Sequence, residues 1–364
     1  MRSIRISIAM VITLLISIGI IMIYSSSGIF ASQELGDGLY FLKRHLIFLG
    51  VGICAMLTTM SMDYRLLRKW AKPLILFSIL LLIVVLIPQV GQSSFGARRW
   101  FKIGPYHLQP SELTKLTMII YVADFLARKD YKITRFWQGF MPLMLVLGTC
   151  CFLIIRQPDL GNSVLIALST LIMMFIAGAR IVHLSVLGVL AMPVLYLLVV
   201  RVEYRLKRII AFINPWEDAQ GIGFQLSQSQ IALGSGGIFG VGLGKSMQKL
   251  FYLPAAHTDF ILSIIGEELG LIGTLSVVFL FAIFIWQGAR IIKRTTDPFG
   301  YYLAIGIMAM LGLQAVVNIG VSIGALPTKG LPLPFVSYGG SALVFNMIAV
   351  GLLLNISRME DLGH

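Results

Sequence analysis

The side chains in this sequence that could do chemistry are carboxylates at the edge of apolar runs or inside them. Asp259 directly precedes one such run, and Glu267 and Glu268 lie eight and nine residues further along it. On a straight helix, that spacing places the two glutamates about 12 to 13 Å beyond Asp259. A carboxylate at a water boundary can act as a general base, whereas carboxylates in hydrocarbon need partners or protonation. Asp259 is therefore the candidate for proton transfer.

Spacing alone leaves two interpretations of each carboxylate open. Asp259 is placed either to cap the helix that follows, which spacing favours, or to take a proton from a hydroxyl group at the membrane surface. Glu267 and Glu268 either form a hydrogen-bonded pair that fixes helix packing or act in catalysis directly. We predict that these two glutamates are structural acids within the membrane.

Other charged side chains flank apolar runs in the same way. Glu112 and Lys115 lie one helical turn apart, which predicts a local ion pair with Ser111 as the helix cap. Asp159 is either a turn residue or a site carboxylate. Lys329 lies in the proline-rich segment 327–341 and is either a phosphate ligand or an exposed loop lysine.

Positive charge collects in two connections that we assign to the outer side of a membrane. The first contains Arg98 and Arg99, and the second has a basic cluster at 205–208. Cations on the outer side oppose the usual bias and indicate an anionic ligand or a lipid headgroup; the alternative is that long loops cross regardless of charge. Lys245 ends a glycine-rich stretch, but Phe239 replaces a glycine that a phosphate loop requires, which excludes nucleotide binding.

The elements that must position these groups are apolar helices. The 364 residues are 57% hydrophobic and 12% charged, which excludes a soluble globule. Runs long enough to cross about 30 Å of hydrocarbon recur along the chain and predict an all-α polytopic membrane protein with about ten transmembrane helices in a single domain, 1–364. The predicted spans are 6–24, 42–60, 73–88, 112–127, 140–156, 161–178, 182–200, 260–286, 300–324 and 340–357.

Charge in the short connections predicts the orientation. The second, fourth and eighth connections are rich in Lys and Arg, Lys129 and Lys132 among them, which is typical of cytoplasmic loops. Both termini are therefore predicted to be cytoplasmic. The segment 201–259 becomes a large extracytoplasmic loop with interfacial helices near 204–212 and 224–233. The formal net charge of +13 belongs to this membrane pattern, so no nucleic acid partner is expected.

Several motifs together resemble the shape, elongation, division and sporulation (SEDS) family of peptidoglycan glycosyltransferases, from the first span to Arg358. They resemble the FtsW and SpoVE branch more than RodA. The segments that carry the resemblance are Arg99-Trp100, Gln109-Pro110-Ser111-Glu112, Gln157-Pro158-Asp159-Leu160-Gly161, Ala177-Gly178-Ala179-Arg180, Asn214-Pro215-Trp216, His257-Thr258-Asp259-Phe260 with Glu267-Glu268, and Pro327 to Ser341. Ala255 and Ala342 depart from the residues that are frequent in the family.

The resemblance implies a substrate and a mechanism. The substrate is lipid II, an undecaprenyl-pyrophosphoryl disaccharide pentapeptide, polymerised on the outer face of the bacterial cytoplasmic membrane during division. An α-linked donor becomes a β-1,4 linkage, so the reaction inverts the anomeric centre with Asp259 as the general base. The resemblance thus favours catalysis over capping at Asp259. Supporting or substrate-binding residues are expected at Arg98, Arg99, Glu112, Lys115, Asp159, Lys245, Lys249, His257, Lys329 and Ser337.

Cofactor and partner expectations follow from the same resemblance. No cofactor is firmly expected; a divalent cation, Mg²⁺ or Mn²⁺, could share the pyrophosphate charge, but the sequence shows no specific site. The expected protein partners are a class B penicillin-binding transpeptidase and other division proteins at the septum. The alternatives are a lipid II flippase, because intramembrane carboxylates also suit transport, and a non-catalytic scaffold of the division machinery.

Overall fold

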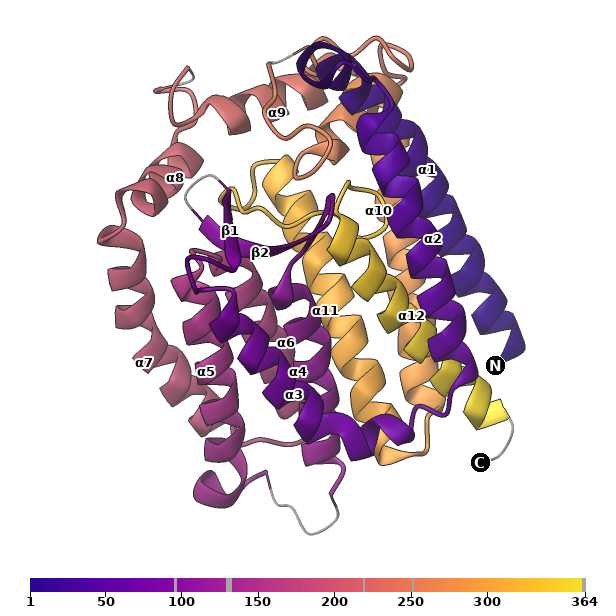
Figure 1. The fold of residues 1–364 in the computed structure, drawn as a ribbon, viewed down its shortest axis with the longest axis vertical. Helices are drawn as coiled ribbons and strands as arrows, with labels where there is room; N and C mark the ends of the chain where they lie inside the picture. Colours follow the sequence, from indigo (N-terminus) through magenta and orange to yellow (C-terminus); the bar gives the residue numbers. More distant parts are fainter. Residues whose placement is uncertain (95–96, 129–132, 219, 251, 362–364) are drawn as a thin grey trace.

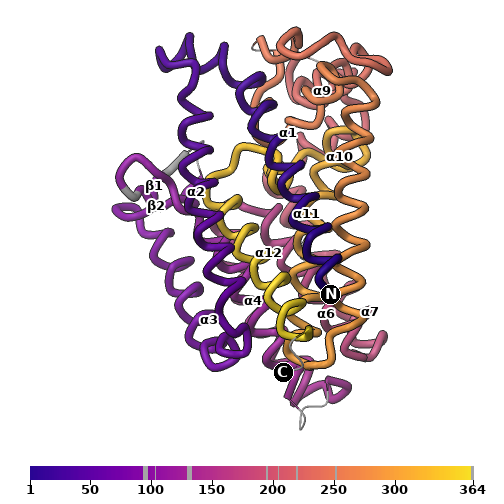
Figure 2. The backbone as a smooth tube through the Cα atoms, turned by 90° about the vertical axis from the view of Figure 1, so that its right-hand side faces the viewer, coloured from indigo at the N-terminus to yellow at the C-terminus, as the bar shows by residue number. Residues whose placement is uncertain are grey.

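A computed structural model shows a bundle of long helices that stand side by side (Figure 1). The structure describes residues 1–94, 97–128, 133–218, 220–250 and 252–361. The N- and C-terminal ends lie at the same end of the bundle (Figures 1 and 2), and the terminal amine contacts the Asp361 carboxylate at 3.1 Å. The two termini therefore lie together at one end of the bundle. Lys129 and Lys132 lie outside the described residues.

Each predicted span falls on a helix. The helices are α1 (Arg2–Leu35), α2 (Tyr40–Ser61), α3 (Leu66–Val84), α4 (Pro110–Leu126), α5 (Met141–Arg156) after a π-helical turn (Phe136–Phe140), α6 (Leu160–Ile176), α7 (Ile181–Val200), α10 (Ile261–Arg294), α11 (Pro298–Ser322) and α12 (Gly340–Asp361). In the described part of the chain, seven helices are long and apolar enough to cross a membrane by length and composition alone. The all-α polytopic prediction is therefore confirmed.

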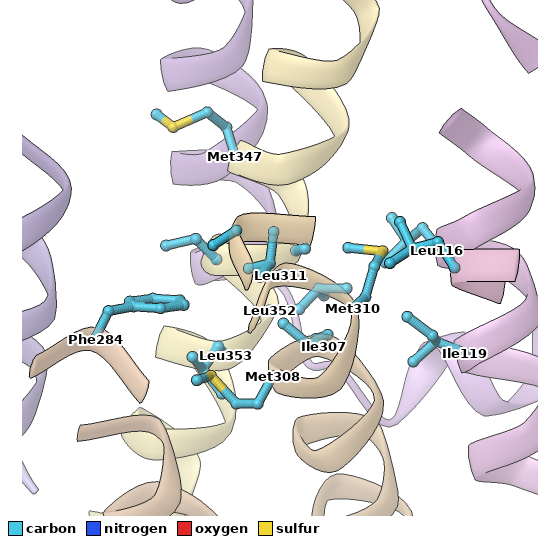
Figure 3. Close-up of a cluster of buried hydrophobic side chains, with 14 of the residues drawn as sticks. Leu116, Ile119, Phe284, Ile307, Met308, Met310, Leu311, Met347, Leu352 and Leu353 are labelled. Atoms are coloured by element: carbon cyan, nitrogen blue, oxygen red, sulfur yellow. The ribbon is translucent and has the colours of Figure 1, made fainter. Parts of the chain in front are cut away.

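The core of the bundle lies where α4, α10, α11 and α12 meet. Figure 3 shows Leu116 and Ile119 of α4, Ile307 of α11 and Leu352 of α12 projecting toward one another. Ile307 is fully buried and Ile119 is 1% exposed. Dense burial of apolar side chains keeps these helices in fixed relation. This rigid core supports the polar groups at the outer ends of α4 and α11.

Residues 201–259 contain the two short helices that the amphipathic stretches predicted. They are α8 (Glu203–Ile213) and α9 (Phe224–Ser235). Figure 1 shows both at the end of the bundle opposite the termini, with α8 connected to the peripheral helix α7. Together with the proline-rich segment 327–339, they cover the outer ends of the core helices.

The third connection forms a small antiparallel sheet, which the all-α prediction did not include. Strands β1 (Gly91–Ser94), β2 (Ala97–Ile103) and β3 (Tyr106–Leu108) pair in sequence order, with Trp100 opposite Gln92 and Lys102 opposite His107. Gly104 has a φ of 60°, which lets a two-residue hairpin turn join β2 to β3. Glycine, serine and arginine give these strands a weak strand signal, so the sequence did not reveal the sheet.

Helix α10 is broken near its start, which corrects the straight helix that we predicted over 260–286. Gly270 has φ 69° and ψ −162°, a conformation that L side chains rarely adopt. At the break, backbone groups of α10 form hydrogen bonds with the glycine-rich segment. The Val241 N–H donates to the Glu267 carbonyl, and the Leu271 N–H donates to the Gly237 carbonyl. Glu267 and Glu268, just before the break, contact the 201–259 loop through Met247 and Lys249.

We expect Gly270→Ala to destabilise the protein strongly. A Cβ atom there would lie 2.4 Å from the Gly240 amide nitrogen and 2.4 Å from the Ile238 carbonyl oxygen, and both are backbone atoms that cannot rotate away. The positive φ adds strain of about 1–3 kcal/mol. Thermal unfolding of purified protein measures the effect. Gly148→Ala is the matched control, because nothing lies within 4 Å of a Cβ at that helical position. Equal melting temperatures for the two variants would contradict the structure.

Candidate active site at Asp259

Asp259 lies directly before α10 but does not cap it. The N-cap residue is Phe260, and no side-chain cap hydrogen bond is present at this helix start. The Asp259 backbone carbonyl instead accepts a hydrogen bond of 2.9 Å from the Asn318 side-chain amide on α11. The capping interpretation is therefore wrong, and the half-buried carboxyl group is left without that structural task.

The environment of Asp259 raises the pKa of its carboxyl group to about 6. Burial is the largest cause, and the negative charge of Asp159 acts in the same direction. The guanidinium groups of Arg208 and Arg99 oppose the shift because they favour the ionised form. A carboxyl group whose pKa lies just below neutral pH is ionised at pH 7 and can still accept a proton readily, as a general base must.

Two guanidinium groups act on this carboxylate, and a third cation, Lys329, lies in the chain segment beside it. Arg208 of α8 donates a 3.0 Å hydrogen bond to the Thr328 carbonyl, and Arg99 of β2 donates one of 2.9 Å to the Gln157 carbonyl. Lys329 follows Thr328, and a Cβ at neighbouring Gly330 would lie 3.4 Å from an Asp259 carboxylate oxygen. Burial lowers the pKa of the Lys329 amine. This arrangement places positive charge where an anionic leaving group could be stabilised.

Asp159 is a helix cap that also forms part of a buried polar network. Its carboxylate accepts from the Asn162 backbone N–H at 3.2 Å, from the Asn162 amide at 2.9 Å and from the Gln109 amide at 2.9 Å. Asn162 also donates to the Ser111 hydroxyl at 3.3 Å. We had predicted that Ser111 caps α4. The N-cap residue is instead Gln109, and proline follows in the first turn.

Glu112 and Lys115 form the predicted ion pair, at 2.8 Å, with both side chains only 2% exposed. The Lys115 amine also donates to the Gln314 side-chain carbonyl at 3.3 Å. Gln314 and Asn318, one turn apart on α11, donate 2.8 Å hydrogen bonds to the Pro332 and Leu331 carbonyls respectively. This chain of contacts links the buried ion pair to the proline-rich segment and, through Asn318, to Asp259.

His257 and Ser337 act within the fold of the two segments that meet at Asp259. The His257 ring lies 4.5 Å from the ring centre of Phe41 and 5.8 Å from that of Tyr338, and burial lowers its pKa to about 4. The His257 carbonyl accepts a hydrogen bond from the Tyr338 N–H. The Ser337 hydroxyl accepts from the Leu333 N–H at 2.9 Å and so closes a turn.

Other predicted site residues lie elsewhere. Lys249 is 4% exposed and pairs with fully buried Glu268 at 2.9 Å, and Ser25 of α1 donates to the same glutamate at 2.7 Å. Glu267 accepts a 2.8 Å bond from the Met247 N–H and a short one from the Ser246 hydroxyl. Glu267 and Glu268 therefore do not bond each other, as the predicted pair would; each has its own partners. Lys245 and Arg98 are exposed at the surface.

The sequence interpretation missed several polar residues of this site. Arg208 was recognised only as part of a basic cluster, and its proximity to Asp259 depends on how α8 folds over the bundle. Gln314 and Asn318 carried a usable signal, because polar amides inside an apolar span need buried partners. Within the described ranges, no group of three or more His, Cys, Asp or Glu side chains is placed to hold a metal ion.

Known proteins resemble this chain along nearly all of its length. The family model FtsW/RodA/SpoVE, described as cell cycle protein, matches residues 5–362. The probable peptidoglycan glycosyltransferase FtsW of Trichlorobacter lovleyi is 49% identical over 96% of this chain and 91% of that protein. The stage V sporulation protein E of Bacillus subtilis is 45% identical over 95% and 94% of the respective chains.

Solved structures agree with this relationship. One solved chain matches this one with a TM-score of 0.78 and 27% identity over 97% of both chains. It is described by the words "Structural coordination of polymerization and crosslinking by a peptidoglycan synthase complex". The rod shape determining protein RodA of Thermus thermophilus gives a TM-score of 0.72 at 28% identity, over 96% of this chain and 95% of that one. The chain is therefore an integral membrane protein that belongs to the FtsW/RodA/SpoVE family of cell cycle proteins.

Proposed function

We propose that this protein is a peptidoglycan glycosyltransferase that polymerises lipid II into glycan strands on the outer face of the cytoplasmic membrane. The observation that carries the proposal is the half-buried Asp259 carboxyl group with its raised pKa beside the guanidinium groups of Arg208 and Arg99. Relatives that are 45% to 49% identical over almost the whole chain, one of them named a probable glycosyltransferase, support the same reaction.

Asp259 acts as the base in an inverting displacement. Its carboxylate removes the proton from the 4-hydroxyl of the acceptor sugar as that oxygen attacks the anomeric carbon of the donor. The new bond joins the 4-oxygen to that carbon, and the bond from the carbon to the lipid pyrophosphate breaks. The leaving pyrophosphate retains the bonding electrons, and Arg208, Arg99 and Lys329 stabilise its charge. A strong acid is therefore unnecessary on the leaving-group side.

The cellular setting follows from this assignment. Both termini lie at one end of the bundle (Figure 1), which we assign to the cytoplasm, and Asp259, directly before α10, is assigned to the outer side. The protein acts at the division septum with a class B penicillin-binding transpeptidase and other division proteins, because a glycan strand must also be crosslinked. A solved structure that is similar to this chain and is described as a peptidoglycan synthase complex supports such a partnership.

Polymerisation of labelled lipid II by the purified protein tests the assignment. Glycan strands are expected either from the protein alone or after addition of the transpeptidase partner. Reactions with added Mg²⁺ or Mn²⁺, and with a chelator, show whether a cation shares the pyrophosphate charge. Absence of polymer under every one of these conditions would overturn the proposed activity.

We expect the polymerisation rate to fall as the pH is lowered through about 6. The pKa of Asp259 is raised to about 6, so the carboxylate is ionised above that pH and protonated, and unable to accept a proton, below it. His257 does not titrate in this range, because burial lowers its pKa to about 4. Rates measured from pH 5 to 8 at saturating lipid II provide the test. A profile that stays flat across this range would contradict the role of Asp259.

A further inference from the structure

A cavity lies directly beside the site. Its volume is about 470 Å³, within the range of pockets that hold small ligands. Helix α2, the three-stranded sheet and the segments around Thr258 and Tyr338 enclose it. Its lining is rich in aromatic rings and also has one guanidinium group from Arg44 and amide and imidazole groups from Gln92 and His107. The mechanism above assigns no task to this cavity.

At two places, consecutive residues of the chain separate this cavity from the Asp259 site. Successive side chains of a strand point to opposite faces, so β2 directs Arg99 toward the Gln157 carbonyl and Trp100 into the cavity. Thr258 also lines the cavity, while the next residue, Asp259, is coupled electrostatically to Arg99. A molecule held in the cavity thus lies against Thr258, the residue directly before the general base.

The lining has the chemistry of a carbohydrate site. Aromatic rings pack against the C–H faces of a sugar, and planar amide, imidazole and guanidinium groups hydrogen-bond its hydroxyls and acetamido groups. Trp100, Tyr106 and Tyr338 supply rings, and the Gln92 amide oxygen lies 2.7 Å from the His107 ring nitrogen. Burial, assisted by the charge of Arg44, lowers the pKa of His107, so its ring is neutral at pH 7.

Arg44 is held in place for such a role. Its guanidinium group lies 4.6 Å from the ring centre of Tyr40 and 5.9 Å from that of Tyr106, and it donates a hydrogen bond to the Pro105 carbonyl. The cavity lining includes no carboxylate. Arg44 forms no ion pair among the described residues, and such a fixed cation suits a neutral or anionic ligand and disfavours a cationic one.

We propose that this cavity binds the disaccharide of the acceptor and presents its 4-hydroxyl to Asp259. The inference rests on the proposed function. The donor must place its pyrophosphate among Arg208, Arg99 and Lys329, on the other side of residues 258–259, because the bond that breaks ends on that phosphate. The attacking hydroxyl must approach from the opposite side in an inverting displacement, and the cavity lies on the face of β2 opposite to Arg99.

The test separates the acceptor from the donor. Lipid II whose 4-hydroxyl is blocked by an added galactose can serve only as donor. With this donor held at a saturating concentration, ordinary lipid II is titrated as acceptor for Arg44→Gln and Trp100→Leu. We expect the acceptor concentration at half-maximal rate to rise about tenfold, which corresponds to the loss of one or two stacking or hydrogen-bonding contacts. The titration of blocked donor at saturating acceptor is expected to stay as in the parent.

Matched controls lie on the same chain. Lys43→Gln removes a neighbouring exposed cation of α2, and Trp70→Leu removes a tryptophan that is 61% exposed on α3. Gln92→Ala provides a third cavity variant with little effect on packing, and thermal unfolding shows that each variant is folded. The inference is overturned if the folded cavity variants need no more acceptor than the controls, or if the shift appears only in the donor titration.

Failure of this inference is distinguishable from failure of the proposed function. Binding of the lipid-free disaccharide pentapeptide to the full-length protein is measured by saturation-transfer NMR. Binding that Trp100→Leu weakens about tenfold and Asp259→Asn leaves intact supports the cavity, even if no polymer forms. Polymerisation by the parent together with unchanged binding and kinetics in the cavity variants refutes the cavity alone.

Discussion

Asp259→Asn is expected to lower the rate of lipid II polymerisation by a factor on the order of a hundred or more, in a protein that still folds. Asparagine has nearly the same volume as aspartate and cannot accept a proton from the attacking hydroxyl. Folding should survive, because the Asp259 side chain makes no cap hydrogen bond to α10 and its backbone carbonyl still accepts from Asn318. Rates and melting temperatures of the purified variant provide both measurements.

Asp218→Asn is the matched control, since this exposed carboxylate lies in the same loop and accepts a hydrogen bond from the Ile222 N–H of its own turn. It should polymerise at the parental rate. The small residual rate of Asp259→Asn should also lose the inflection near pH 6 that the parent shows. If Asp259→Asn polymerised lipid II as fast as the parent, the proposed base would have to be abandoned.

Lys249→Met is expected to destabilise the protein by about 3–5 kcal/mol, because it leaves the buried Glu268 carboxylate without its cation. The remaining donor, Ser25, cannot neutralise a charge. Glu268→Gln should also destabilise the fold, because it leaves the Lys249 amine unpaired, and Glu267→Gln should weaken the bonds that anchor 246–248. Thermal unfolding is the measurement, with polymerisation assayed on the folded fraction.

The exposed Lys207–Glu203 pair of α8 serves as the comparison, since it joins the same two residue types at 2.7 Å in solvent. Lys207→Met should change stability by no more than about 1 kcal/mol. Normal stability of the Glu268→Gln or Glu267→Gln variant with complete loss of polymerisation would instead make these glutamates catalytic.

The helical bundle was predictable because hydrocarbon-crossing segments carry a strong signal in length and apolarity. Two details were not. The sheet at 91–108 depends on a hairpin turn and on pairing between weak strand formers. The break in α10 depends on Gly270, which reads like any other small residue in a span until its φ of 69° and the wrapping segment 237–242 are known.

The site, too, has residues that the sequence could indicate and residues whose position depends on tertiary structure. Asp259 could be proposed as the base only because its motif resembles a known family, since its position at the start of an apolar run favoured a helix cap. Lys249 could not be assigned from its charge, because its partnership with Glu268 joins segments that lie 19 residues apart. Arg208 and Arg44 reach the site only through the tertiary placement of α8 and α2, about which local patterns give no information.

Reconstitution into vesicles tests the central claim most directly, because it separates polymerisation from transport. Purified protein is placed in vesicles with labelled lipid II, with and without a class B penicillin-binding protein, and both glycan strand length and the leaflet position of the label are followed. The account predicts long strands from the parent, no strands from Asp259→Asn, and strand formation that does not depend on movement of lipid II between leaflets. Movement of lipid II without any polymer would contradict it and favour a flippase.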